Sequence, residues 1–356
     1  MTPDVERFTG GHAVGVDVAA IERDLAALWR KASTSGAEHS VTRACSWNLV
    51  VYATTDAELA RAKHLADALV AVVPSRTLLL NQRTNANGPE VEAFVTANCR
   101  MMPGGGKLVC TEEITLEARG RGGDHLPSLT RALLVPDIPT AVLWASVPAR
   151  TPLVDELVSA ADRLIVDTGA LGSEGLERVQ SLGTKATHRV ADLAWLRTAP
   201  RRLAIAGAFD PPVDAGLLYR LKRVSLECAP EAVAGAKLLL GWLGARLGWG
   251  TPEPLDHRDT PGWRIPRQQG TVLVDLTSAA TGAGLACLTF ESERGERVRV
   301  TSTAAGLTID GTWPTHTLPH VTLADEALVV AALGPRGRDK LYPAALHRAT
   351  ELEDRT

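Results

Sequence analysis

The stretch that decides the fold is His125–Ser146, with the sequence HLPSLTRALLVPDIPTAVLWAS. It predicts a helix, then a turn held by Pro136 and Pro139, then a buried strand that ends near Trp144. The turn is rigid because each proline fixes its own φ angle. A helix that leads into a short, continuously apolar strand is typical of α/β proteins. The proline turn lies outside the apolar pattern of the stretch, whereas five apolar residues are expected in the core: Leu129, Leu133, Leu134, Val142 and Leu143.

The segments before and after this stretch extend the same pattern. An apolar strand around 47–52, an amphipathic helix over 56–72 and a strand over 77–80 form a βαβ unit, which predicts a parallel pair with a right-handed crossover. Two β segments, 91–101 and 107–119, follow before the central stretch. We therefore predict an N-terminal α/β domain with a mixed, partly parallel sheet flanked by helices.

The domain organisation follows from proline and from the change in pattern. Asp210-Pro211-Pro212 ends a helix, because proline cannot donate to the helix ladder, and it sets the boundary between domains at 17–212 and 213–356. The second domain is predicted as a smaller α+β domain, with an antiparallel meander between 271 and 309 packed on helices. Residues 250–270 are predicted to be a loop, and residues 1–16 a disordered lead.

Composition excludes several classes of protein. The chain has 356 residues, 45% hydrophobic and 22% charged, with a net charge of −3. The chain is long enough to bury a large hydrophobic core, so it needs no disulfide or metal ion to hold its fold. A net charge this close to zero does not indicate a basic surface for binding nucleic acid or an anionic membrane. No secretory signal and no bilayer-spanning apolar run is visible, so we expect a cytoplasmic protein.

The cysteines carry no pairing pattern. The set is odd in number and widely spaced, which predicts reduced thiols: Cys45, Cys99, Cys110, Cys228 and Cys287. Cys110 alternates with apolar neighbours, which favours a buried structural cysteine, and a redox thiol at Cys110 stays open as an alternative.

No catalytic, cofactor or metal motif survives inspection. Gly104–Lys107 resembles a phosphate loop, but Leu108 replaces the required Ser or Thr and a strand follows where a helix is needed. His316 and His320 have a ligand spacing, but the prolines around them disfavour a helix and no third ligand lies close in sequence. We therefore predict no catalytic residue, no cofactor and no metal, and hence a protein that is not an enzyme.

A short basic loop precedes the last predicted helix. Arg336, Arg338 and Lys340 are candidates for binding an anion such as a sugar phosphate. A solvated loop is the favoured alternative. The tryptophans lie on apolar segments, so a core position is the default for Trp144 and Trp195, and only a partly covered Trp would act as an interface anchor.

Several segments together resemble one family. They occur in the family's order along nearly the whole chain: Arg43 to Leu49 with Cys45, Trp47 and Asn48, Pro74–Thr77, Cys110–Ile114, Leu129–Pro139 with Trp144, Asp192–Arg197, Gly241–Leu247 and Asp339–Tyr342. The chain resembles the bacterial glucose-6-phosphate dehydrogenase assembly proteins, the OpcA family. It departs from the family pattern in keeping one Trp after the central strand and in having Glu112 beside Glu113.

The resemblance implies a non-catalytic partner that binds glucose-6-phosphate dehydrogenase and promotes its active form, as an allosteric activator in the oxidative pentose phosphate pathway and so in NADPH production. The expected contact residues are Arg76, Arg131, Pro136, Asp137, Ile138, Pro139, Trp144, Asp192, Trp195 and Arg197. An alternative holds that residues such as Asp137 and Trp195 only support the fold. A second alternative is a sugar-phosphate sensor, or an undetected enzyme, using the basic loop at 336–340. Thiol-dependent control, associated with cyanobacterial members, is not supported by these cysteines alone.

Overall fold

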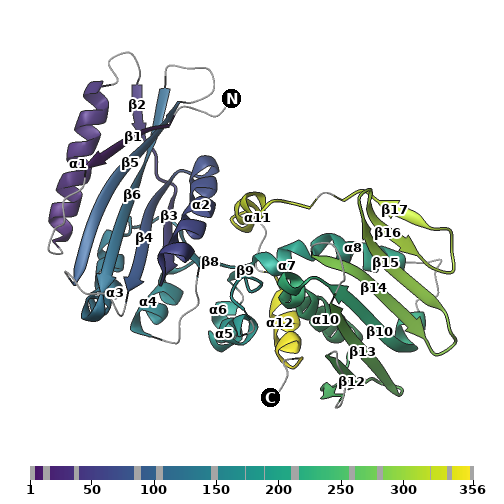
Figure 1. The fold of residues 1–356 in the computed structure, drawn as a ribbon. Helices are drawn as coiled ribbons and strands as arrows, with labels where there is room; N and C mark the ends of the chain where they lie inside the picture. The colour runs from purple at the N-terminus through teal and green to yellow at the C-terminus, as the bar shows by residue number, and fades with distance from the viewer. Residues whose placement is uncertain are drawn as a thin grey trace. The chain divides into compact units, whose positions relative to one another are not determined.

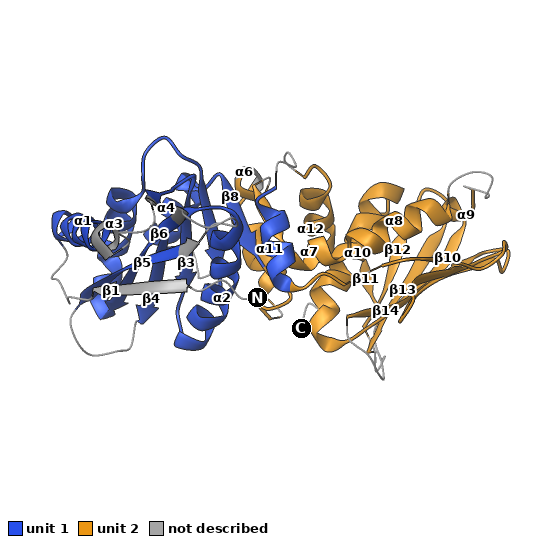
Figure 2. Cartoon of the chain, turned by 90° about the horizontal axis from the view of Figure 1, so that it is seen from above, with its two compact units in different colours: residues 1–166, 325–335 blue, residues 167–324, 336–356 orange. Residues whose placement is uncertain are grey.

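A computed structural model describes residues 5–10, 17–35, 40–83, 90–101, 107–145, 151–172, 174–187, 189–209, 216–255, 261–278, 284–320, 322–334 and 339–352. The chain forms two compact units, each with its own sheet (Figures 1 and 2). Unit 1 comprises Met1–Val166 and Asp325–Pro335, and unit 2 comprises Asp167–Ala324 and Arg336–Thr356.

Unit 1 is built on a mixed sheet. Its strands are β1 (Val5–Gly10), β2 (Ser40–Arg43), β3 (Trp47–Ala53), β4 (Ser75–Arg83), β5 (Val91–Met101), β6 (Lys107–Arg119), β7 (Thr140–Trp144) and β8 (Arg163–Val166). Its helices are α1 (Val18–Ser35), α2 (Asp56–Val72), the 3-10 turn η1 (Gly120–His125), α3 (Leu126–Leu133), α4 (Pro152–Ala160) and α11 (Asp325–Ala332).

Within unit 1 the order across this sheet is β1-β5-β6-β4-β3-β7-β8, and β2 pairs with the start of β6. The strands β6, β4, β3, β7 and β8 run parallel, and β5 runs antiparallel to both β6 and β1. A capping box starts α2. The Thr55 side chain accepts a hydrogen bond from the backbone N–H of Glu58, and the Glu58 side chain accepts one from the backbone N–H of Thr55. The predicted βαβ unit and partly parallel sheet are confirmed.

Helices flank both faces of the unit 1 sheet. Lys63 of α2 pairs with Glu113 on one face of β6, and Trp29 of α1 donates to Glu112 on the other. Successive residues of a strand point to opposite faces, so α2 and α1 lie on opposite sides.

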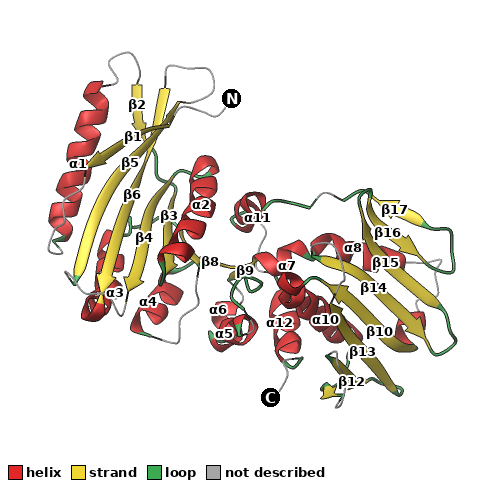
Figure 3. Cartoon of the chain, viewed as in Figure 1, coloured by secondary structure: helices red, strands yellow, loops and turns green. Residues whose placement is uncertain are grey.

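Unit 2 combines a second sheet with helices (Figure 3). Its helices are α5 (Gly175–Ser181), α6 (Thr184–Thr187), α7 (Leu193–Arg197), α8 (Ala199–Ala208), α9 (Gly216–Tyr219), η2 (Pro230–Ala232), α10 (Val233–Leu247) and α12 (Tyr342–Thr350). Its strands are β9 (Val190–Asp192), β10 (Leu221–Cys228), β11 (Glu253–Pro254), β12 (Gly262–Pro266), β13 (Thr271–Ser278), β14 (Leu285–Ser292), β15 (Arg297–Thr303), β16 (Gly306–Asp310) and β17 (His316–Leu318).

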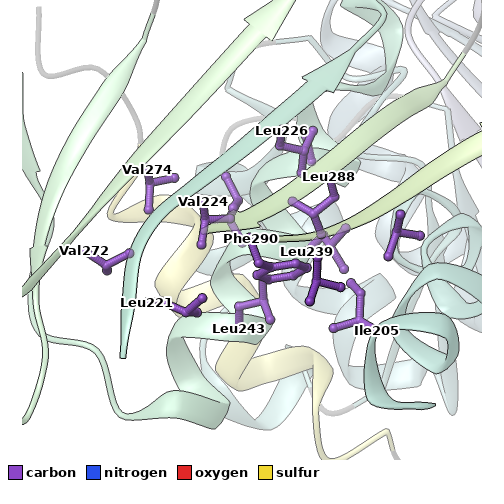
Figure 4. Close-up of a cluster of buried hydrophobic side chains, with 14 of the residues drawn as sticks. Ile205, Leu221, Val224, Leu226, Leu239, Leu243, Val272, Val274, Leu288 and Phe290 are labelled. Atoms are coloured by element: carbon purple, nitrogen blue, oxygen red, sulfur yellow. The ribbon is translucent and has the colours of Figure 1, made fainter. Parts of the chain in front are cut away.

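The sheet order is β11-β12-β13-β10-β14-β15-β16-β17. The strands β14, β15 and β16 form an antiparallel meander as predicted, and β17 extends it. The segment predicted as the first strand of the meander is β13, which pairs antiparallel with β12 and parallel with β10, the only parallel pair among the described strands of this sheet. Figure 4 shows the core beneath it, where Phe290 and its neighbours on the sheet meet Ile205 of α8 and Leu239 and Leu243 of α10. The prediction of an antiparallel meander packed on helices is confirmed for β14 to β16 and is wrong for β13.

Three expectations from sequence differ from the structure. The compact units divide after Val166, whereas proline placed the boundary after residue 212, and α11 returns to unit 1. The helix α8 belongs to unit 2, because Ala204, Ile205 and Ala208 enter its core. The predicted loop at 250–270 contains the strand β12, which pairs with β13. The predicted disordered lead contains β1, which pairs with β5, and residues 1–4 and 11–16 lie outside the described residues.

The prediction of reduced thiols is wrong for one pair. Cys99 and Cys110 form a disulfide, since they face each other across the antiparallel pair β5–β6. Both side chains are buried. Cys45, Cys228 and Cys287 remain free thiols.

Among the described residues, no helix has the length and apolarity to cross a membrane. The same residues hold no group of three His, Cys, Asp or Glu side chains suited to a metal ion.

Candidate functional site

A row of four buried polar side chains crosses the sheet of unit 1, at the amino ends of β7, β3 and β4 and in the middle of β6. Thr140 of β7 lies beside Asn48 of β3, Asn48 beside Arg76 of β4, and Arg76 beside Glu112 of β6. We call these four residues the amino-end row. Neighbours in register on a sheet share a face, so the row faces α1 and α3. All four residues are less than 6% exposed, and buried polar groups of this kind must find partners within the protein.

Arg76 is the centre of charge in the row. Its guanidinium donates to Glu112 at 2.8 Å, to Glu22 of α1 at 2.8 Å and to the carbonyl oxygen of Leu133 at 3.0 Å. Burial opposes the charge, and the carboxylates of Glu22 and Glu112 outweigh it, so the pKa of Arg76 is raised. Arg76 therefore joins β4, α1 and the end of α3, which favours the alternative that it holds the fold.

Glu112 completes this cluster. Its carboxylate also accepts from the indole N–H of Trp29 at 2.6 Å and pairs with Arg43 at 2.7 Å. The carboxylate therefore bonds to two arginines and one indole, as a buried charge requires.

Asn48 fixes the central turn. Its amide accepts from the backbone N–H of Val135 at 2.9 Å and donates to the carbonyl oxygen of the same residue at 2.9 Å. On the other side of the turn, the Thr140 backbone N–H donates to Asp162 at 2.9 Å. The Asn48 backbone N–H also donates to the carbonyl oxygen of Pro139 at 2.9 Å. The two ends of the turn are thus held by hydrogen bonds to the body of unit 1.

The turn between these anchors reaches solvent. Pro136 and Asp137 are exposed, and Ile138 and Pro139 are half-buried. Asp137 has a φ of 61°, which lies in the left-handed backbone region that residues other than Gly, Asn and Asp rarely adopt. The structure therefore presents an exposed carboxylate on a rigid turn, as the sequence predicted for this segment.

Two other predicted contact residues of unit 1 lie in different settings. Arg131 on α3 is exposed and pairs with Glu156 of α4 through two of its nitrogens. Trp144 is 2% exposed, inside the sheet, and its indole N–H has no hydrogen-bond partner among the described residues. Burial removes Trp144 from any surface, so the default core position holds for it.

In unit 2, Asp192 is fully buried between β9 and α7. It accepts from the Thr168 backbone N–H at 3.1 Å, the Thr168 hydroxyl at 2.8 Å, the Ala194 backbone N–H at 3.0 Å and the Tyr342 hydroxyl at 3.1 Å. Burial, and secondarily the charge of Asp167, raises the pKa of Asp192 to about 6. The pKa of Tyr342 is raised for the same first reason.

Trp195 is held from three sides. Its indole N–H donates to Asp339 at 2.7 Å, its ring tilts against Tyr342, and the Arg202 guanidinium lies 3.3 Å from its ring centroid. Asp339 also caps the start of α12 by accepting from the backbone N–H groups of Leu341 and Tyr342. Two of the three segments that carried the resemblance in this unit, Asp192–Arg197 and Asp339–Tyr342, therefore meet, and Asp192 and Trp195 support the fold.

Arg197 differs from these two, because a third of its side chain is exposed. Its two terminal nitrogens bind Asp167 at 2.9 Å each, a bidentate pair. The basic loop is described in part: Lys340 is exposed, and Arg336 and Arg338 lie outside the described residues. Cys110, predicted as structural or redox-active, is in the disulfide with Cys99.

Sequence reasoning did not assign the roles of Asn48 and Glu112. Asn48 stands one residue inside β3 and Glu112 stands five residues inside β6, each where an apolar residue is expected, and that polar interruption was the available signal. The row also explains the resemblance of unit 1, since Asn48, Arg76 and Glu112 come from three of its separate segments.

Comparison with known proteins gives the family. The glucose-6-phosphate dehydrogenase subunit N-terminal domain of OpcA matches residues 66–181, and the corresponding C-terminal domain matches residues 188–346. The chain belongs to the OpcA family. A protein of Synechocystis sp. named OxPP cycle protein OpcA is 30% identical over 202 residues, which are 56% of this chain and 42% of that protein. The OpcA protein of Nostoc punctiforme is 28% identical over 202 residues, 56% of this chain and 42% of its own length. The matched region thus spans less than half the length of these OpcA relatives.

Two solved structures are similar at a lower level. A glucose-6-phosphate 1-dehydrogenase from Mycobacterium avium has 8% identity and a TM-score of 0.46, over 87% of this chain and 91% of that one. A protein described as an oxidoreductase from Magnetospirillum magnetotacticum has 13% identity and a TM-score of 0.43, over 87% of this chain and 99% of that one. These scores are below the level at which a shared fold follows.

Proposed function

We propose that the chain binds glucose-6-phosphate dehydrogenase and promotes its active form without turning over substrate itself. Membership of the OpcA family carries this proposal, since both matching domains are named for that dehydrogenase. The proposal includes a role in the oxidative pentose phosphate pathway, in the cytoplasm, as a protein partner that needs no cofactor.

We further propose that the Pro136–Pro139 turn belongs to the contact surface. Its ends are pinned by Asn48 and Asp162, so little conformational entropy is lost when a partner binds it. Asp137 offers an exposed carboxylate, which a basic side chain of the dehydrogenase would bind. Arg131 in the same unit and Arg197 in unit 2 are further candidate contacts, because both are at least partly exposed.

Activation sets a thermodynamic requirement on this surface. A partner with equal affinity for the active and inactive enzyme shifts nothing, however tightly it binds. A tenfold shift in the population needs about 1.4 kcal/mol of extra affinity for the active form. A few charge-assisted hydrogen bonds that form only with the active enzyme would supply that difference.

The test is the saturation curve of the cognate dehydrogenase for its sugar phosphate, followed by NADPH absorbance as this chain is titrated in. We expect a lower apparent KM or a higher maximal rate that saturates with the chain. The chain alone is expected to produce no NADPH. An unchanged curve at saturating chain, or turnover by the chain alone, contradicts the proposal.

A further inference from the structure

The sheet of unit 2 has a core face and an outer face. Val224 and Leu226 of β10 and Leu288 and Phe290 of β14 point into the core, where α8 and α10 pack (Figure 4). Successive residues of a strand point to opposite faces, so the residues that alternate with these point away from the helices. Those outward residues are half-buried or exposed over 223–227, 287–291 and 297–301, whereas the residues between them are buried. We call this side of the sheet the outer face.

Charged side chains lie on the outer face in equal numbers of each sign. Over 223–227, 273–277, 287–291 and 297–301, the outward residues include three arginines and three carboxylates: Arg223, Arg297, Arg299, Glu227, Asp275 and Glu291. Within the chain, Arg223 pairs with Asp275, and Arg297 pairs with Glu291 at 3.7 Å. A face of balanced charge does not repel a second copy of itself.

The register of the strands sets an acid and a base at opposite ends of one outward row. Asp275 of β13 lies beside Ser225 of β10, Ser225 lies beside Thr289 of β14, and Thr289 lies beside Arg299 of β15. Asp275 and Arg299 are therefore equally far from the line between β10 and β14, one on each side of it.

A twofold axis along that line makes the outer face complementary to itself. When two copies stack face to face about this axis, each residue meets the residue at the mirrored position in the other copy. Asp275 then faces Arg299 of the other copy. Arg223 and Glu291 lie beside each other on either side of the line, so each faces the opposite charge in the other copy. A twofold axis across the strands, through the row from Asp275 to Arg299, would set like charges against each other, so the register favours the axis along the strands.

The outer face is large enough for a specific interface. The strands β10, β13 and β14 have eight residues each, and at about 3.3 Å per residue they are about 26 Å long. The strands from β13 to β16 in the sheet order, at a spacing of about 4.8 Å, are about 24 Å across. Two such faces would bury roughly 1,200 Å² in total, which reaches the range of specific protein interfaces.

We propose that the outer face of the unit 2 sheet is a dimer interface, occupied by a second copy of this chain about a twofold axis between β10 and β14. The inference goes beyond the proposed function, because it concerns the chain alone. Its tests contain no dehydrogenase, so their failure leaves the activation assay unaffected.

The first test is the mass of the full chain alone, measured by sedimentation equilibrium over a range of concentrations at low salt. We expect a monomer–dimer equilibrium. Arg299→Glu sets a carboxylate against Asp275 of the other copy and is expected to weaken dimerisation about tenfold or more. Glu291→Lys sets a lysine against Arg223 of the other copy and is expected to have a similar effect. Arg246→Glu makes the same charge change as Arg299→Glu at an exposed position of α10 and is expected to dimerise like wild type.

The second test uses Cys287, which lies on the outer face beside the proposed axis. It is a half-buried free thiol on β14, opposite Glu227 of β10. One strand spacing of about 4.8 Å and a sheet separation of about 10 Å place the two Cys287 Cα atoms about 11 Å apart. A short bis-maleimide is therefore expected to join two copies of the chain. The joined species should be lost in Cys287→Ser and kept in Cys45→Ser, which removes a half-buried thiol of unit 1.

Three results would overturn the proposal. The first is a monomer at every concentration. The second is dimerisation at wild-type affinity in whichever of Arg299→Glu and Glu291→Lys folds. The third is a wild-type dimer that the bis-maleimide does not join through Cys287. A chain that is monomeric alone but loses dehydrogenase binding on Arg299→Glu would assign the outer face to the dehydrogenase, which also overturns the proposal.

Discussion

Replacing the buried Asp192 by asparagine tests the electrostatics of unit 2 directly. Burial, with a smaller contribution from the charge of Asp167, raises the pKa of the Asp192 carboxyl from 3.8 to about 6. One pKa unit corresponds to about 1.4 kcal/mol, so a difference of about two units corresponds to about 3 kcal/mol. Because the folded-state pKa is raised, the protonated carboxyl of Asp192 stabilises the folded state by this amount relative to the ionised form. That contribution to the free energy of unfolding is fully present below pH 3.8 and is lost as the pH rises through 6.

Asparagine should keep the hydrogen bonds while removing the titration. One oxygen of Asp192 accepts from the backbone N–H groups of Thr168 and Ala194, and asparagine retains that oxygen. The other oxygen faces the hydroxyls of Thr168 and Tyr342, which can rotate to accept from an amide. Asp192→Ala loses all four hydrogen bonds and serves as the destabilised control, at about 1 kcal/mol for each bond lost.

The assay is urea unfolding of wild type and Asp192→Asn between pH 4 and pH 7.5. The difference between the two free energies of unfolding isolates residue 192, since every other titrating group is shared. We expect wild type to lose about 3 kcal/mol relative to Asp192→Asn as the pH rises over this range. A difference that stays constant with pH would refute the reasoning.

Two further predictions concern packing. Arg76→Met removes a cation from a buried ion pair and should lower the free energy of unfolding by about 3–5 kcal/mol, measured in urea, whereas Arg131→Met, at an exposed pair, should leave the midpoint unchanged. A wild-type midpoint for Arg76→Met would show that the buried pair is not needed. Gly241→Ala places a methyl against the carbonyl oxygen of Ala345, between α10 and α12, and should lower stability by about 1–3 kcal/mol. Gly207→Ala, on α8 with open space around it, should raise Tm slightly, and equal effects of the two changes would contradict the packing argument.

The central stretch was predictable because its signals are local. Proline near the start of α3, the two prolines of the turn and the apolar run of β7 each act within a few residues. The division of the stretch into core and turn is confirmed for Leu129 and Leu133, which are buried, and for Pro136 and Asp137, which are exposed, whereas Leu134, expected in the core, is half-buried. What the sequence did not show was the Asn48 side chain that pins the turn, because its partner Val135 is 87 residues away.

The disulfide could have been found from symmetry. The run Pro103–Gly106 is a turn signal whose midpoint lies equally far from residues 99 and 110. An antiparallel hairpin about that midpoint places Cys99 opposite Cys110, as the register of β5 and β6 confirms. The number and spacing of the cysteines alone do not reveal this pairing, which depends on their positions on the two strands.

The unit boundary shows a limit of local reasoning. Proline marks where a helix ends and carries no information about which core the helix joins. The apolar side of α8, with Ile205 and Ala208, packs in unit 2 although it precedes Pro211. The return of α11 to unit 1 depends on contacts with α2, more than 250 residues earlier, such as the pair of His64 with Glu326, 262 residues apart.

The central claim is that the Pro136–Pro139 turn contacts the dehydrogenase, and its most direct test is the affinity of the full chain for the enzyme by isothermal titration calorimetry. Asp137→Asn is the informative variant, since asparagine tolerates the φ of 61° and removes only the charge. Asp124→Asn removes an equal charge from an exposed residue at the other end of α3. We predict that Asp137→Asn weakens binding about tenfold, as expected for lost charge-assisted hydrogen bonds, while Asp124→Asn binds like wild type. Wild-type affinity in Asp137→Asn would contradict the account.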